Sequence, residues 1–244
     1  MSEFTRIDGR KVDELRPITA AVGVLKKADG SALFKFGGTV AIAGVFGPRK
    51  VYPKHMEEAE RAILRTKYNM ASFATTERGR PGISRRSTEI SLVTRQALMP
   101  LLFLDEYPKT AIDVHIEILQ AEASSRCVGI NAACLALADA GIPMRDLVAS
   151  CSAGKVELHD AQGASVGSQV VLDIAGEEDT EGDLDLPIAY YPKKNQVTLL
   201  QMDGIVNKKE AMEIIKKAIG GAEQIYKVQK DALKHKYAFE EVSL

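Results

Sequence analysis

Apolar and polar residues alternate along the first third of the chain, in runs that are separated by glycine-containing turns. Residues 18–26 alternate, Asp29-Gly30 is a strong hairpin signal, and residues 32–36 follow at once. Gly37-Gly38 then marks a second turn before the β-prone run 39–46. This pattern predicts a meander of three antiparallel strands.

The period of the apolar positions changes in the next part of the chain. Residues 61–68 fit another strand or a short helix, and the segment ERGRPGISRR after them has the composition of a loop. Residues 111–119 alternate strictly, which predicts a strand with one apolar face. Between them, a helix that begins near Ser84–Ser87 is indicated by apolar residues at spacings of three to four, namely Ile90, Val93, Ala97 and Leu101.

The second half of the chain is predicted to continue this mixture of helices and strands. Ser124 or Ser125 can cap a helix of small residues that runs to Ala140, and a long helix is expected over residues 208–236, with a possible break at Gly220-Gly221. The expected strands are 148–160, 170–174, 184–190 and 197–203. The order of elements indicates an α/β fold in which mixed and antiparallel β-sheets are interleaved with α-helices.

Composition narrows the class of protein. Of the 244 residues, 45% are apolar and 27% are charged, as in soluble globular proteins. The apolar runs are far shorter than the roughly 20 residues of a membrane span, and the charged N-terminus lacks an apolar signal region, so we expect a cytoplasmic protein without a membrane partner. The net charge of −1 means that any nucleic-acid site must be local. Cys127, Cys134 and Cys151 lack zinc-site spacing, and we expect structural roles for them.

The segment from Asp173 to Asp185 contains seven carboxylates in thirteen positions and no Lys or Arg. Asp185 falls on a predicted strand, on the face opposite Leu186, and the turn at Gly182 can bring Asp179 back toward it. Two carboxylates held in this way can coordinate a divalent cation such as Mg²⁺, and one of them can act as a general acid. A solvated loop is the alternative.

Two further clusters fit the binding of anions. Ser124, Ser125 and Arg126 stand at the start of the small-residue helix, where unpaired N–H groups and the helix dipole favour an oxyanion such as phosphate; simple capping is the alternative. Arg85 and Arg86 open the earlier helix, where cations oppose the dipole unless an anion relieves them; a solvated basic loop is the alternative. Together with the acidic segment, these clusters are the parts that phosphoryl transfer on a polyanion requires.

Long stretches of the chain resemble the RNase PH family, and are most similar to the catalytic RNase PH-like subunits of archaeal exosomes. The stretches are RIDGRKVDELRPI, DGSALFKFGGTVAIAGVFGPR, TAIDVHIEILQAEASSR, ALADAGIPMRDLVA and DLDLPIA. The resemblance runs from about Arg6 to Tyr237 and implies one RNase PH-like domain over residues 1–244, with halves of about 1–145 and 146–244.

The resemblance implies a phosphorolytic 3′-to-5′ exoribonuclease. Such an enzyme uses inorganic phosphate, with Mg²⁺ or Mn²⁺, to release nucleoside 5′-diphosphates from the RNA 3′ end, and it also catalyses the reverse tailing reaction. By position, Asp179 and Asp185 match the family's acidic pair, which is also its metal site, and Ser124, Ser125 and Arg126 match its phosphate site. The matching RNA-binding residues are Arg85 and Arg86, with Tyr52 and Lys54 at the ring's entrance.

The resemblance also implies protein partners for this chain, and two alternative functions remain beside the one just described. Family members of this type alternate with a noncatalytic paralogue in a six-membered ring that carries RNA-binding cap proteins. A noncatalytic RNA-threading scaffold and a homohexameric tRNA-trimming RNase PH are the alternatives. The chain departs from the family pattern at Glu122, where an Asp is usual, and at Ser124, where a Gly that tolerates positive φ is usual. Tyr52 stands where a His is common.

Overall fold

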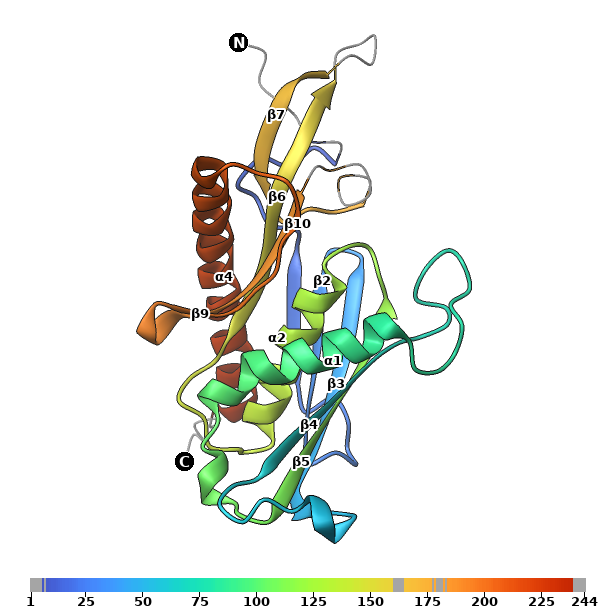
Figure 1. Ribbon diagram of the computed structural model, residues 1–244, viewed down its shortest axis with the longest axis vertical. Coiled ribbons are helices and arrows are strands. Elements are labelled where there is room, and N and C mark those ends of the chain that lie inside the picture. Colours follow the sequence, from blue (N-terminus) through green and yellow to red (C-terminus); the bar gives the residue numbers. More distant parts are fainter. Residues whose placement is uncertain are drawn as a thin grey trace, which may run out of the picture.

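The computed structural model describes residues 6, 8–159, 165–176, 178, 182 and 184–238, and it contains two five-stranded sheets (Figure 1). The first sheet has the strand order β1-β2-β3-β5-β4. β1, β2, β3 and β5 are antiparallel neighbours, and β4 runs parallel to β5. The strands are β1 (Ile18–Val22), β2 (Gly30–Phe36), β3 (Thr39–Lys50), β4 (Ile63–Met70) and β5 (Thr110–Gln120).

The second sheet is antiparallel throughout. Its order is β10-β8-β6-β7, and β9 also pairs with β8. The strands are β6 (Ala149–His159), β7 (Ser165–Leu172), β8 (Leu184–Tyr191), β9 (Gln196–Leu200) and β10 (Asp203–Gly204). Short 3-10 turns lie at Lys54–Met56, Met99–Leu101, Leu104–Glu106 and Pro192–Lys194.

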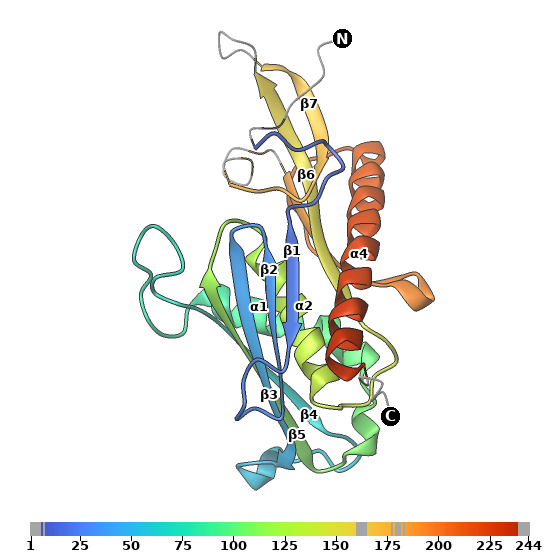
Figure 2. The same cartoon turned by 180° about the vertical axis from the view of Figure 1, so that it is seen from behind.

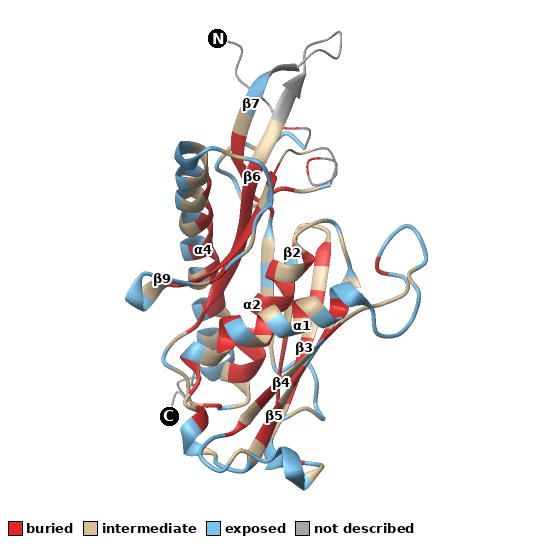
Figure 3. Ribbon diagram, in the orientation of Figure 1, coloured by how far each residue is buried: buried red, intermediate tan, exposed pale blue. Residues whose placement is uncertain are grey.

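The helices α1 (Arg85–Leu98), α2 (Ser125–Asp139) and α4 (Lys208–Tyr237) cover the sheets. α2 is buried almost all round because it contacts both sheets, which explains its small, apolar residues (Figure 3). α4 packs one apolar stripe against the second sheet. Seen from behind, the strands of the first sheet lie in front of α1 and α2, so these two helices cover the other face of that sheet (Figure 2). No helix in the described part of the chain is long and apolar enough to cross a membrane.

Most of the predicted elements are confirmed, including the antiparallel meander and the apolar face of β5, where Ile112, Val114, Ile116 and Ile118 are buried. Several boundaries were wrong. β1 ends at Val22, where Gly23 adopts a left-handed conformation with φ of 73°. β3 continues past the predicted end at residue 46 to Lys50, and β7 spans Ser165–Leu172 instead of 170–174. The single strand expected over 197–203 is divided into β9 and β10, although Gln201 N between them still donates to Pro187 O of β8 at 3.1 Å.

The helix break predicted at Gly220-Gly221 is also wrong, because α4 is continuous from Lys208 to Tyr237. Gly221 is needed for close packing and not for a turn. A Cβ there would lie 2.7 Å from Leu172 Cδ1 and 2.8 Å from Cys151 Sγ, whereas a Cβ at Gly220 would meet nothing within 4 Å. Gly221 therefore lets α4 approach the second sheet.

This difference predicts opposite effects of two neighbouring substitutions on the free energy of unfolding. Gly221→Ala overpacks the core and is expected to destabilise the protein by about 1–3 kcal/mol. Gly220→Ala is expected to stabilise it by about 0.5–1 kcal/mol, because it only improves helix propensity. Denaturant unfolding of both variants checks this, and equal effects would contradict the packing role of Gly221.

Candidate functional site

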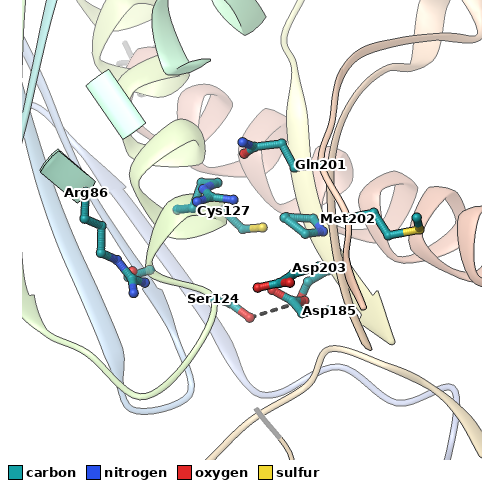
Figure 4. Close-up of a pocket in the computed structure, with 11 residues that line it drawn as sticks. Arg86, Ser124, Cys127, Asp185, Gln201, Met202 and Asp203 are labelled. Atoms are coloured by element: carbon teal, nitrogen blue, oxygen red, sulfur yellow. Dashed lines mark hydrogen bonds between the residues drawn. The ribbon is translucent and has the colours of Figure 1, made fainter. Parts of the chain in front are cut away.

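A pocket of about 460 Å³ lies where the starts of α1 and α2 meet the second sheet. Figure 4 shows Arg86 on one side of it, with Ser124 and the carboxylates of Asp185 and Asp203 on the other. Three separate clusters from the sequence therefore contribute to one cavity. Its lining residues are Arg86, Ser124, Ser125, Arg126, Cys127, Ser152, Asp185, Pro187, Gln201, Met202 and Asp203.

The start of α2 has an unusual backbone. Ala123 and Ser124 both have left-handed conformations, with φ of 60° and 53°. An N-cap residue normally has an extended backbone, and the Ser124 side chain accordingly makes no capping hydrogen bond. Its Oγ instead lies 3.0 Å from Ser152 Oγ, the dashed line in Figure 4, and donates to Ile174 O at 3.3 Å. Side-chain capping by Ser124 is thus ruled out, and Ser124 bears the strain that Gly would avoid.

Ser125 is held by a tyrosine from the first sheet. The Tyr68 hydroxyl donates to Ser125 Oγ at 3.0 Å, and both residues are buried. Burial raises the pKa of Tyr68, although the Ser125 contact and the charges of Arg86 and Arg126 oppose it, so the phenol remains a donor at neutral pH. Because its oxygen already accepts this bond, the Ser125 hydroxyl is able to donate its own hydrogen toward a ligand.

Arg126 is oriented by Glu89 of α1. Arg126 Nη2 donates to Glu89 Oε2 at 3.1 Å, and Gln201 Nε2 donates to Glu89 Oε1 at 2.8 Å. Arg126 Nε is buried and has no acceptor among the described residues, which is costly for a charged donor. An oxyanion at the start of α2 would satisfy this donor together with the unpaired N–H groups of the first helical turn.

Asp185 lies on β8 directly opposite Asp203 of β10 in the antiparallel ladder, and both residues line the pocket. The predicted orientation of Asp185 is confirmed, since Leu184 and Leu186 are buried on the opposite face. Asp203 was missed by the sequence reasoning. Pairing the predicted strands 184–190 and 197–203 end to end places Asp203 opposite Leu184, and the register shift between Ala189 and Tyr190 moves it by one residue to face Asp185.

Asp179, the predicted partner of Asp185, lies outside the described residues. The solvated-loop alternative is wrong for two other members of the acidic segment. Asp173 is fully buried, and Glu178 is 3% exposed and ion-paired with Arg6. Part of the acidic crowding therefore serves buried ion pairs.

Asp185 and Asp203 fit a hard divalent cation, which commonly takes one or two carboxylates together with phosphate oxygens. Within the described ranges, no group of three or more His, Cys, Asp or Glu residues is placed to hold a metal.

The remaining predicted residues are divided between the pocket and other places. Arg85 and Arg86 begin α1 as expected, but only Arg86 lines the pocket. Tyr52 and Lys54 lie outside it, in the loop and short turn after β3 at the lower end of the first sheet (Figure 1). Cys127 lines the pocket, but burial raises its pKa to about 12, so its thiol stays neutral, in accord with a structural role.

Comparison with known proteins extends this description. The family described as "3′ exoribonuclease family, domain 1" matches residues 14–143, and "domain 2" of that family matches residues 146–221. The exosome complex component Rrp41 of Pyrococcus furiosus is 56% identical over 232 residues, which cover 95% of this chain and 89% of that protein. The Methanopyrus kandleri Rrp41 is 50% identical, with coverages of 95% and 93%.

The crystal structure of rice (Oryza sativa) Rrp46 superposes with a TM-score of 0.80 at 22% identity, and covers 94% of this chain and 100% of that one. At this identity the likeness shows a shared fold. The family matches span most of the chain, and the relatives are identical to it at half of the aligned positions or more. The chain therefore belongs to the 3′ exoribonuclease family, the RNase PH family.

Proposed function

We propose that the chain is the catalytic subunit of an exosome-type ring that shortens RNA from its 3′ end by phosphorolysis. In this reaction an oxygen of inorganic phosphate attacks the terminal phosphodiester, the bond to the preceding 3′ oxygen breaks, and a nucleoside 5′-diphosphate is released. The observation that supports it is the presence of an anion-binding helix start, two arginines and two carboxylates in one pocket.

Each part of the pocket has a defined task in this proposal. The first turn of α2, the Ser125 hydroxyl and Arg126 hold the attacking phosphate, while Arg86 holds the phosphodiester of the RNA. Asp185 lies on the opposite side of the pocket from Arg86 (Figure 4), and the bound phosphates would bring their negative charge next to it. A divalent cation at Asp185 and Asp203 would neutralise part of that charge.

The ring is part of the same proposal, with a noncatalytic paralogue as neighbour. It is supported by the relatives, which are named as exosome components, and by apolar side chains on the surface beside the pocket. Met202, which lines the pocket, is 50% exposed, and Ile205, three residues further along the chain, is 92% exposed. Exposed apolar side chains of this kind favour an interface between subunits.

An assay of RNA shortening tests the proposed function. The full chain, alone and mixed with its paralogue, is incubated with a 3′-tailed RNA and Mg²⁺, with and without inorganic phosphate. We expect shortening only when phosphate is present, with nucleoside 5′-diphosphates as products. Monophosphates that form regardless of phosphate would contradict phosphorolysis, and no product in any mixture would favour a scaffold.

Arg86 and its neighbour Arg85 provide a matched pair for RNA binding. Arg86→Ala is expected to weaken RNA binding about tenfold and to lower the slope of log affinity against log salt by about 1, because one phosphate contact is lost. Arg85→Ala should have a smaller effect, since Arg85 does not line the pocket. Binding titrations at several salt concentrations check this, and equal losses in both variants would remove the special role of Arg86.

A further inference from the structure

The N-terminal motif RIDGRKVDELRPI has no task in the proposed chemistry, yet three of its arginines reach the acidic segment. The N-terminal motif crosses the second sheet before the chain enters β1 (Figure 2), and Val12 O of the motif accepts a hydrogen bond from Leu172 N at 2.8 Å. All three guanidinium groups contact residues from Leu172 to Glu178, just before the predicted catalytic carboxylates. The three residues are Arg6, Arg10 and Arg16.

Arg6 and Arg10 contact the acidic segment alone, apart from their own stretch of chain. Arg6 pairs with Glu178 through Nε, at 2.8 Å, and Nη2, and it donates to the carbonyl oxygens of Leu172 and Asp173 at 2.7 and 2.8 Å. Arg10 Nη1 donates to Asp173 Oδ2 at 2.9 Å. These contacts fix the path of the acidic segment as it leaves β7.

Arg16 differs because it contacts two loops at once. Its Nε and Nη2 form a two-pronged pair with the buried Asp173 carboxylate, at 2.9 and 2.6 Å. Its Nη1 donates to Glu122 O at 2.5 Å, in the loop that leads into the proposed phosphate site at the start of α2. The guanidinium also lies over the Phe36 ring, 4.8 Å from its centroid, which restricts its orientation.

Among the described residues, Ser124 Oγ also joins the acidic segment to the loop before α2. It donates to Ile174 O at 3.3 Å, which is a long and weak contact. The short, charged contacts of Arg16 are therefore the firmest link between them. Reacting phosphate groups tolerate little displacement, since misplacement by about 1 Å can cost a hundredfold in rate.

We propose that Arg16 is a positioning residue that fixes the acidic segment relative to the phosphate-binding loop, residues 121–124 before α2. Arg6 and Arg10 anchor the acidic segment but do not link it to that loop. This inference rests on the proposed function. It requires the planar fork of arginine, because only a guanidinium can bind the Asp173 carboxylate through two nitrogens and reach Glu122 O with a third.

The test compares Arg16→Lys with Arg10→Lys in the assembly that shows phosphorolysis. Both variants keep the charge. Arg16→Lys loses the two-nitrogen pair with the Asp173 carboxylate, and Arg10→Lys loses the paired contacts with Asp173 Oδ2 and the main-chain oxygen of Asp173. Arg16→Lys is expected to lower kcat/KM for phosphate by about 30-fold or more, with RNA affinity within about twofold of wild type. Arg10→Lys should lower the melting temperature about as much as Arg16→Lys does. Its kcat/KM for phosphate should stay within about threefold of the wild-type value, because Arg16 still links the acidic segment to the phosphate-binding loop. Similar kinetics in the two variants would overturn the proposal.

Asp173→Asn provides a second variant if Arg16→Lys does not fold. It keeps one acceptor for Arg16 and removes the charge. We therefore expect kcat/KM for phosphate to fall, but by less than in Arg16→Lys. Wild-type phosphate kinetics in Asp173→Asn would overturn the proposal.

Equilibrium binding of inorganic phosphate without RNA separates this inference from the proposed function. If the wild type binds phosphate but does not shorten RNA, the proposed function fails. The positioning role of Arg16 can still be tested in that case, through the phosphate affinities of the variants. Arg16→Lys should then weaken phosphate binding and Arg10→Lys should not. Equal binding by both variants would overturn the positioning role.

Discussion

Replacing Asp185 by Asn is expected to lower turnover by about 10²–10⁴-fold, the range that a positioned acid–base group contributes, while RNA affinity changes little. The change preserves the shape of the side chain on β8 but removes its ability to bind a cation or to donate a proton to the leaving 3′ oxygen. In the proposed function, RNA is bound by Arg86 on the other side of the pocket, which the substitution leaves in place. Single-turnover rates and RNA titrations of the same preparation check both parts.

Asp203→Asn is the matched control for Asp185→Asn, because the two aspartates face each other across one ladder position. If Asp203 only assists a cation, its variant should need a higher Mg²⁺ concentration for half-maximal rate and approach wild-type turnover at saturation. An Asp185→Asn variant with the wild-type rate would remove Asp185 from the chemistry.

Replacing Arg126 by Ala is expected to raise the KM for phosphate by about 10- to 150-fold. That range corresponds to the loss of one charged hydrogen-bonding partner, about 1.5–3 kcal/mol. The guanidinium is held by Glu89 and its buried Nε has no acceptor among the described residues, so it is prepared to bind an oxyanion. Initial rates over a range of phosphate concentrations measure this.

Two controls accompany Arg126→Ala. Arg145→Ala removes an exposed arginine that stacks on Phe103 away from the pocket, and it should leave the KM for phosphate unchanged. Glu89→Gln keeps an acceptor for Arg126 but loses the charge, so its KM should rise only a few-fold. A loss of kcat in Arg126→Ala without a change in the KM for phosphate would contradict its role as a phosphate ligand.

Local patterns were sufficient for the elements that carry the site. Spacings of three to four predicted α1 with Arg86 in its first turn, and the two-residue period of a strand predicted that Asp185 of β8 faces away from Leu184 and Leu186. Where the prediction failed, tertiary contacts decided the outcome. Gly221 signalled a helix break by its propensity, but the close approach of α4 to Leu172 and Cys151 is what requires a glycine.

The acidic segment shows why composition alone could not separate its members. Asp173 and Glu178 pair with arginines more than 150 positions earlier, since Arg16 and Asp173 are 157 residues apart and Arg6 and Glu178 are 172 apart. Nothing within the segment marks Asp173 and Glu178 as members of buried ion pairs. Asp203 was missed for a similar reason, because its proximity to Asp185 depends on the register between strands.

The backbone at Ser124 was the most informative departure from the family pattern. The family resemblance implied that a Gly is usual there, and the φ of 53° shows why. The Ser124 hydroxyl compensates in part through its contacts with Ser152 and Ile174, which tie the phosphate-binding loop to the second sheet. Such compensation depends on residues 28 and 50 positions away and could not be read from the motif itself.

In the proposed reaction, inorganic phosphate bound at Ser125 and Arg126 is the nucleophile. An experiment with labelled phosphate shows where this phosphate goes. RNA is shortened by the active assembly in the presence of ³²P-phosphate, and the products are separated. We expect one label in the β-phosphate of each nucleoside 5′-diphosphate released, with transfer by the Asp185→Asn variant slower by about 10²–10⁴-fold. Shortening of the RNA to monophosphates, with all of the label remaining as inorganic phosphate, would contradict the claim.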